Sequence, residues 1–184
     1  MTARERILET AYDLFAHNGI RAVGIGQIVE EAGVAKMSLY NSFASKEQLV
    51  LAFLDLREQR WTRGWLEAAI DDGDEVPATR PLALFDALDD WFHEDDFERC
   101  PFINTLLEVH DPSDPVAQAA VSHLETVRAT IEERVAEAGI ASPEKVAAQL
   151  HLLMMGAIVA ASAGDLDAAR RARELAELLL DGAS

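Results

Sequence analysis

The stretch that decides the architecture of this chain is GQIVEEAGVAKMSLYNSF, residues 26–43. Gly33 divides it, because a residue without a Cβ can take a positive φ at the end of one helix and turn the chain sharply. A second short helix begins near Lys36, and Leu39 and Phe43, four residues apart, form its buried face. A helix, a glycine-containing turn and a second short helix make the helix-turn-helix pattern, whose second helix enters the major groove of DNA.

The remaining side chains of the second helix are of the types that contact phosphates and base edges. Lys36 supplies a point charge, and Ser38 and Tyr40 supply hydroxyl donors, for the DNA backbone. Asn41 has the amide group that reads adenine with two hydrogen bonds. Met37 can touch a thymine methyl group, although an exposed gap-filling side chain is an equally good interpretation.

Two further polar side chains join this set. Gln27 faces outward near the start of the first helix of the pair, where it can reach a phosphate or a base. Lys46 supplies a second point charge for phosphate. The residues expected to bind DNA are therefore Gln27, Lys36, Met37, Ser38, Tyr40, Asn41 and Lys46.

Helices are predicted on both sides of the pair. From Ala3 to His17 apolar residues recur at intervals of three and four, with Thr2 and Glu5 as a capping box at the start and Asn18-Gly19 as the stop. After the pair, a long helix is predicted from Lys46 to Ile70. This arrangement resembles the N-terminal domain of the TetR family of bacterial transcriptional regulators. The resemblance covers about the first third of the chain and is carried by Ile7, Ala11, Leu14, Phe15, Gly19, Ile25, Ile28, Ala32, Gly33, Val34, Lys36, Leu39, Tyr40, Phe43, Lys46, Glu47 and Leu49.

The resemblance implies that Lys36, Ser38, Tyr40 and Lys46 contact DNA, and that the protein is a dimer. The chain departs from the family pattern at several positions. Val23 and Gly24 stand where Thr or Ser is usual, Met37 where Gly is common, and Ser42 where His is common. These departures remove a side-chain helix cap and weaken one phosphate contact.

The charge of the chain is distributed unevenly. The net charge is −17, yet residues 1–64 hold eight basic and eight acidic residues, so the negative charge lies entirely in residues 65–184. A DNA reader is usually basic. We interpret the chain as a neutral headpiece on an acidic body that DNA repels, which suppresses non-specific binding; the alternative is that acidity serves solubility alone.

Composition predicts an all-α protein of about nine helices. The chain has 184 residues, of which 49% are hydrophobic, and it is rich in the helix formers Ala, Leu, Glu and Arg. We expect a three-helix helix-turn-helix DNA-binding domain in residues 1–46 and a larger helical effector-binding and dimerisation domain in residues 47–184. One cysteine, no signal peptide and no apolar run of about 20 residues indicate a cytoplasmic protein without a membrane partner.

Further helices are predicted in the second domain at residues 81–96, 99–108, 116–138, 146–163 and 165–180, with Ser142 as the N-cap before Pro143. The helix over 146–163 is apolar nearly all round and contains small residues, and the last helix carries an apolar stripe. Two such helices per subunit predict a homodimer with a four-helix interface. A monomeric bundle completed by the same helices is the alternative.

An effector pocket is expected in the second domain, with polar anchors at Asn104, Glu108 or His151. Filled core is an equally good interpretation of each aromatic residue. The candidate lining residues are Trp61, Trp65, Phe85, Trp91, Phe92, Phe102, Asn104, Leu107, Glu108, His123, His151 and Met154. Cys100, near the start of a short helix, is either an oxidant sensor or a buried structural residue, and the acidic residues before it oppose a lowered thiol pKa.

The sequence therefore predicts a ligand-responsive DNA-binding transcriptional regulator, a repressor that a small molecule releases from its double-stranded operator. The alternative is a helical dimeric interaction protein without sequence-specific DNA binding. An enzyme is not expected, because the chain lacks the HExxH, P-loop, Rossmann and nucleophile-elbow motifs. No cofactor and no metal are expected, since the acidic stretch 71–75 lacks the ligand spacing of an EF-hand.

Overall fold

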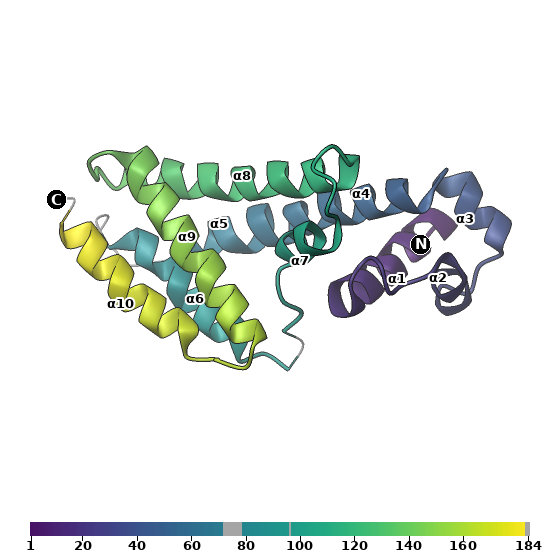
Figure 1. Cartoon of the computed structure of the whole chain (residues 1–184), viewed down its shortest axis with the longest axis horizontal. Coiled ribbons are helices and arrows are strands. Elements are labelled where there is room, and N and C mark those ends of the chain that lie inside the picture. The colour runs from purple at the N-terminus through teal and green to yellow at the C-terminus, as the bar shows by residue number, and fades with distance from the viewer. Residues whose placement is uncertain (72–78, 96, 183–184) are drawn as a thin grey trace. The chain divides into compact units, whose positions relative to one another are not determined.

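The computed structural model describes residues 1–71, 79–95 and 97–182, and in these ranges the chain is helical and contains no strand (Figure 1). The all-α prediction is confirmed. The first half contains α1 (Ala3–Asn18), α2 (Ile25–Glu31), α3 (Lys36–Ser42), α4 (Lys46–Arg57), the π-helical η1 (Glu58–Leu66) and α5 (Glu67–Asp71). The second half contains the 3₁₀ turn η2 (Arg80–Leu82), α6 (Ala83–Phe92), α7 (Pro101–Glu108), α8 (Pro115–Glu137), α9 (Pro143–Ser162) and α10 (Ala168–Asp181).

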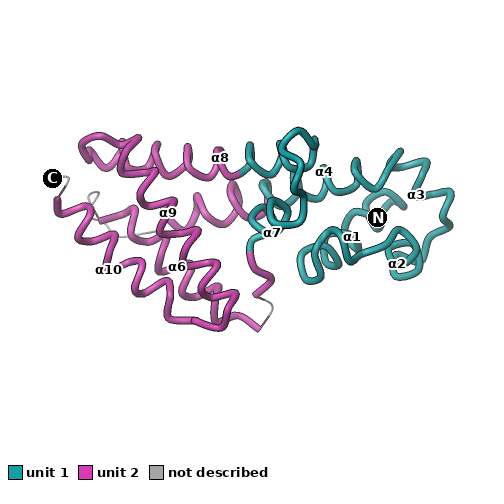
Figure 2. Tube along the Cα trace, viewed as in Figure 1, with its two compact units in different colours: residues 1–59, 100–123 teal, residues 60–99, 124–184 magenta. Residues whose placement is uncertain are grey.

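The chain forms two compact units (Figure 2). The first comprises residues 1–59 and 100–123, and the second comprises residues 60–99 and 124–184. The first unit therefore contains the helix-turn-helix together with α4, α7 and the start of α8. A functional boundary at residue 46 stays a prediction, because the compact units divide the chain at other places.

The core of the first unit follows from local signals and one aromatic cluster. Thr2 and Glu5 form the predicted capping box, with Glu5 N–H donating to Thr2 Oγ1 at 3.2 Å and Thr2 N–H donating to Glu5 Oε2 at 2.7 Å. Phe53 of α4 is fully buried and meets the rings of Tyr12 and Phe15 at centroid distances of 5.4 and 5.5 Å. Burying these rings fixes α4 against α1.

The second unit is built around α6, α9 and α10, which contact one another. Phe85, Leu88, Leu150 and Ala169 are fully buried there. Exposed ion pairs contribute little to folding stability. The stability of the second unit therefore comes mainly from its buried apolar side chains.

Two predicted helices differ from the observed ones. The long helix after residue 46 is continuous to Asp71, close to its predicted end at Ile70, but its middle is the π-helical η1. Residues 72–78, which follow it, lie outside the described residues. The helix predicted over 81–96 begins as a 3₁₀ turn and its α-helical part ends at Phe92. The acidic residues that follow oppose the negative end of a helix dipole, which explains the early stop.

The predicted N-cap position of Ser142 is confirmed, but its side chain does not cap the helix. Ser142 occupies the position before α9, but its φ is +54° and its side chain makes no capping hydrogen bond. In this left-handed conformation the hydroxyl does not reach the amides of the first turn, which an extended N-cap residue would reach.

Candidate nucleic-acid interface

The geometry of α3 separates a buried face from an exposed one. Leu39 is fully buried and Phe43 nearly so, and α3 contacts α1. Met37 and Tyr40 are 69% and 45% exposed, and Asn41 is exposed as well. Burial of one edge holds the helix in place while the opposite edge faces solvent, as the spacing of Leu39 and Phe43 predicts.

The turn between α2 and α3 has the conformation that its sequence requires. Gly33 has a φ of +60°, and the N–H of Val34 donates to the carbonyl of Val29 at 3.2 Å. A side chain with a Cβ would be strained at this φ. The hydrogen-bonded turn fixes the direction in which α3 leaves α2.

Arg4 has a structural role in this unit that the sequence does not reveal. Its guanidinium donates a hydrogen bond to the carbonyl of Ser42 and lies 4.1 Å from the centroid of the Phe43 ring. The start of α1 therefore holds the end of α3. A cation followed along the chain by a distant aromatic residue is too common a pattern to predict this contact.

Three of the expected DNA-contacting residues are partly buried or already hydrogen-bonded within the protein. Gln27 is exposed, and its amide donates to Glu31 Oε1 at 3.0 Å. Ser38 is half-buried. Lys46 is half-buried near the Phe15 ring, and burial lowers the pKa of Lys46 while the charge of Glu108 opposes that shift. Lys36, Met37, Tyr40 and Asn41 form the most accessible part of the expected set.

The expected effector-pocket residues divide between the two units. In the second unit the rings of Trp61, Trp65 and Trp91 form a cluster with centroid distances of 5.1, 5.6 and 6.0 Å. Phe85, Phe92, His151 and Met154 are buried in the same unit. In the first unit Phe102 stacks on His123 at 5.0 Å, Asn104 is half-buried, Leu107 is 69% exposed, and Glu108 accepts hydrogen bonds from the loop after α1.

His151 is a buried polar residue of this set with an unused hydrogen-bonding atom. It lies in α9 with 8% of its surface exposed, and its Nε2 has no hydrogen-bond partner among the described residues. Burial, with a smaller contribution from the charge of Arg128, lowers the pKa of His151 to about 4. The imidazole is therefore neutral at physiological pH and offers an unused hydrogen-bonding nitrogen.

Comparison with known proteins decides the family of this chain. Residues 77–176, more than half of its length, match the family model described as a tetracyclin repressor-like C-terminal domain, and residues 7–53 match the model of bacterial regulatory proteins of the tetR family. The chain belongs to the TetR family. The second match extends the resemblance seen in the helix-turn-helix to the body.

Named relatives of this TetR-family protein match over part of its length. The regulator QacR of Staphylococcus aureus is 36% identical over 70 residues, which are 38% of this chain and 37% of QacR. The repressor KstR2 of Mycobacterium tuberculosis is 45% identical over 85 residues, which are 45% of this chain and 40% of KstR2. The matched part thus spans about two fifths of these relatives.

Solved structures match along the whole TetR-family chain. A TetR-family transcriptional regulator from Streptomyces coelicolor has a TM-score of 0.88 and 29% identity, covering 99% of this chain and 90% of its own. A regulator of the same type from Streptomyces avermitilis has a TM-score of 0.87 and 29% identity, covering 100% and 98%. The arrangement of helices is therefore that of the family throughout.

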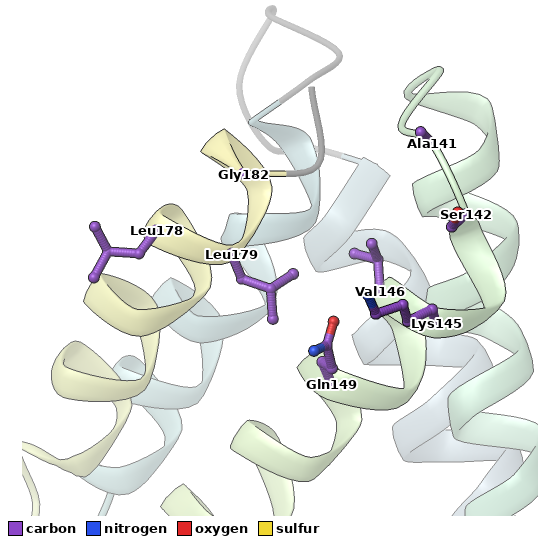
Figure 3. A pocket seen from close by; sticks show the side chains of 8 residues that line it. All are labelled: Ala141, Ser142, Lys145, Val146, Gln149, Leu178, Leu179 and Gly182. Carbon is purple, nitrogen blue, oxygen red and sulfur yellow. The ribbon is translucent and has the colours of Figure 1, made fainter.

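A hollow of about 490 Å³ lies in the second unit of the TetR-family chain, between the start of α9 and the end of α10 (Figure 3). Val146 and Gln149 of α9 and Leu179 of α10 face it, whereas the side chain of Leu178 points away from α9. Its complete lining is Ala141, Ser142, Lys145, Val146, Gln149, Leu178, Leu179 and Gly182. None of these residues belongs to the expected pocket.

Cys100 is buried at the N-cap of α7, with 7% of its surface exposed. Burial raises the pKa of the thiol, and backbone hydrogen bonds and the charge of Arg57 oppose this only in part. The thiolate is the form that oxidants attack, so the structure favours the buried structural interpretation of this residue.

Proposed function

We propose that this TetR-family chain is a DNA-binding transcriptional repressor whose operator affinity a small molecule lowers. The observation that supports DNA binding is the division of α3 into an edge anchored by Leu39 and an edge that exposes Lys36, Tyr40 and Asn41. The relatives QacR and KstR2 are named as a transcriptional regulator and a transcriptional repressor.

We propose a homodimer through α9 and α10. Leu152 and Val159 of α9 are 66% and 52% exposed, and Leu175 and Leu178 of α10 are 54% and 70% exposed. The exposed face of α9 also carries the small residue Gly156. Because α9 and α10 pack against each other (Figure 1), these side chains lie on neighbouring helices. A second copy would cover them and build a four-helix interface.

The composition of α9 is consistent with this role. The helix is long and apolar enough to cross a membrane by length and composition alone, with a mean hydropathy of 1.4 in its most apolar window and 44% of that window buried. Core helices of soluble proteins pass the same test. A cytoplasmic dimer that buries the remaining apolar surface accounts for the composition without a membrane.

We propose that the effector enters the second unit near the tryptophan cluster and His151. Trp61, Trp65 and Trp91 supply aromatic surface, and the neutral His151 imidazole supplies the hydrogen-bonding group that orients a ligand. Such an effector lowers operator affinity by binding better to a conformation whose two headpieces no longer match successive major grooves, about 34–36 Å apart.

Selection of DNA from random sequence, followed by fluorescence anisotropy at two salt concentrations, tests the proposed function. We expect one sequence to be enriched and bound at nanomolar protein. Asn41→Ala should weaken binding to it by about tenfold or more, because it removes two hydrogen bonds to a base. Gln118→Ala, which removes an exposed amide of α8, is the matched control and should bind as the wild type does.

Two outcomes would count against the proposal. If no DNA raises the anisotropy at micromolar protein, the chain is a helical interaction protein without sequence-specific DNA binding. If DNA binds but Asn41→Ala leaves affinity and sequence preference unchanged, α3 is not the reading helix.

A further inference from the structure

A carboxylate at the end of α7 is bonded to the loop between α1 and α2. Glu108 accepts hydrogen bonds from the N–H of Ile20 at 3.3 Å through Oε1 and from the N–H of Arg21 at 2.7 Å through Oε2. We call these two hydrogen bonds the Glu108 contact. All three residues belong to the first compact unit.

The local chemistry of α7 does not explain this side chain. Glu108 is the last residue of the helix, where the negative end of the helix dipole disfavours a carboxylate. Charge-assisted hydrogen bonds to two amides stabilise it there. Both amides lie 87 or more residues away along the chain, so the contact joins the helix-turn-helix to a separate part of the sequence.

The loop is shaped to accept this carboxylate. Gly19, directly before Ile20, has a φ of +82°, and a Cβ placed on it would lie within van der Waals overlap of Glu108 Oε1. Next to the contact, a hollow of about 270 Å³ is lined in part by Ile20, Lys46 and Val109. Side chains therefore fill this junction incompletely, and the two hydrogen bonds provide directional attachment.

The segment that carries Glu108 is continuous at both ends with the second unit. Residues 100–123 belong to the first unit, residue 99 before them and residue 124 after them belong to the second, and α8 runs through the later boundary without a break. A rearrangement of the second unit that displaces α7 therefore also displaces the acceptor of the Ile20 and Arg21 amides.

We propose that Glu108 is a positioning residue that holds the helix-turn-helix to α7 and thereby sets the orientation in which each headpiece meets DNA. The inference rests on the proposed function, because it assigns Glu108 a part in operator binding. A headpiece without the Glu108 contact samples more orientations. Simultaneous binding of two half-sites then costs more conformational entropy, whereas binding of one half-site changes little.

The test compares Glu108→Gln with the wild type. Glutamine keeps the size of the side chain but directs an NH₂ group at one of the two N–H donors, so one hydrogen bond is lost. We expect affinity for the selected two-half-site DNA to fall about tenfold, with less than about twofold change on DNA that has one half-site scrambled. Amide hydrogen exchange at Ile20 and Arg21 should increase. Glu125→Gln, an exposed glutamate of α8, is the charge-matched control.

A second variant breaks the contact from the other side. Gly19→Ala should push the carboxylate away and reproduce the loss of two-half-site affinity. In a Glu108→Ala background the same substitution should cause a smaller loss of that affinity, limited to any effect of the strained backbone. Any cost of the positive φ of an alanine at position 19 would remain in both backgrounds, so the difference between them isolates the contact.

Two results would overturn the inference. Equal loss on both DNAs would show that Glu108 only stabilises the headpiece, and wild-type binding of both DNAs by Glu108→Gln would show that it does not position the headpiece. If the wild-type protein selects no DNA, the proposed function fails, and unchanged exchange of Ile20 and Arg21 in Glu108→Gln would then refute the contact itself.

Discussion

Replacement of Leu152 by glutamine should weaken the proposed dimer without unfolding the subunit. Leu152 is 66% exposed in the single chain and lies on α9 together with the exposed Val159. Glutamine has nearly the same helix propensity as leucine and removes the apolar surface. Because two-thirds of the side chain is already in water, the fold of the subunit loses little.

The size of the effect follows from the exposed fraction. Full burial of a leucine side chain stabilises by about 1.5–3 kcal/mol, so covering the exposed two-thirds contributes about 1–2 kcal/mol. A two-fold interface contains the residue twice, which gives about 2–4 kcal/mol for the dimer. The dimer dissociation constant should therefore rise about 30-fold to 700-fold, since about 1.4 kcal/mol corresponds to a factor of ten.

Sedimentation velocity over a dilution series from micromolar to nanomolar protein measures this change. Leu107→Gln is the matched control, because Leu107 is 69% exposed on α7, away from α9 and α10 in the sequence. Circular dichroism should show the same helicity in all three proteins. Equal dissociation constants for the wild type and Leu152→Gln, or a wild type that is monomeric at micromolar concentration, would refute the assignment of this face.

Three other predictions concern the interior. Burial depresses the pKa of His151 to about 4, so the contribution of the neutral imidazole to stability is complete above pH 6.5 and is lost as the pH falls toward 4. Between pH 7 and 5 the free energy of unfolding, measured with denaturant, should fall by about 2 kcal/mol more for the wild type than for His151→Leu. Equal falls in the two proteins would contradict the buried neutral imidazole. Cys100, whose thiol pKa burial raises, should react with iodoacetamide at pH 8 far more slowly in the native protein than in denaturant, and equal rates would contradict its burial. Phe53→Ala should destabilise the protein by about 3–5 kcal/mol in the same unfolding assay, and a cost below about 1 kcal/mol would show that α4 is not anchored to α1 through this ring.

The helix-turn-helix could be predicted because its determinants are local. Thr2 caps a helix through residues three positions away, Gly33 ends one through its own backbone freedom, and Leu39 and Phe43 share a face because helices repeat every 3.6 residues. Each signal lies within one turn of the residue that it affects. The sequence contains them regardless of how the rest of the chain folds.

The parts that could not be predicted depend on distant residues. Arg4 meets the carbonyl of Ser42 across 38 positions, and Glu108 meets the amide of Arg21 across 87. The sequence places Glu108 among the polar anchors of the expected pocket, and only the tertiary arrangement shows that its carboxylate is engaged by the loop after α1. The π-helical segment within the long helix also lacks a glycine or proline at its start, so no local residue indicates it.

The charge distribution is consistent with the proposed positioning role of Glu108. Residues 1–64 are neutral and the remainder carries −17, so the general electrostatic attraction that supplies much of DNA affinity is weak. Binding must then depend on a few directed contacts from α3, and directed contacts require that the helix meets the groove at the correct angle. In a strongly basic headpiece, loosened attachment would be offset by non-specific phosphate contacts. Here the carboxylate of Glu108 adds one more negative charge beside Lys46. That charge repels DNA, which is consistent with a headpiece whose orientation contributes more to DNA binding than its net charge does.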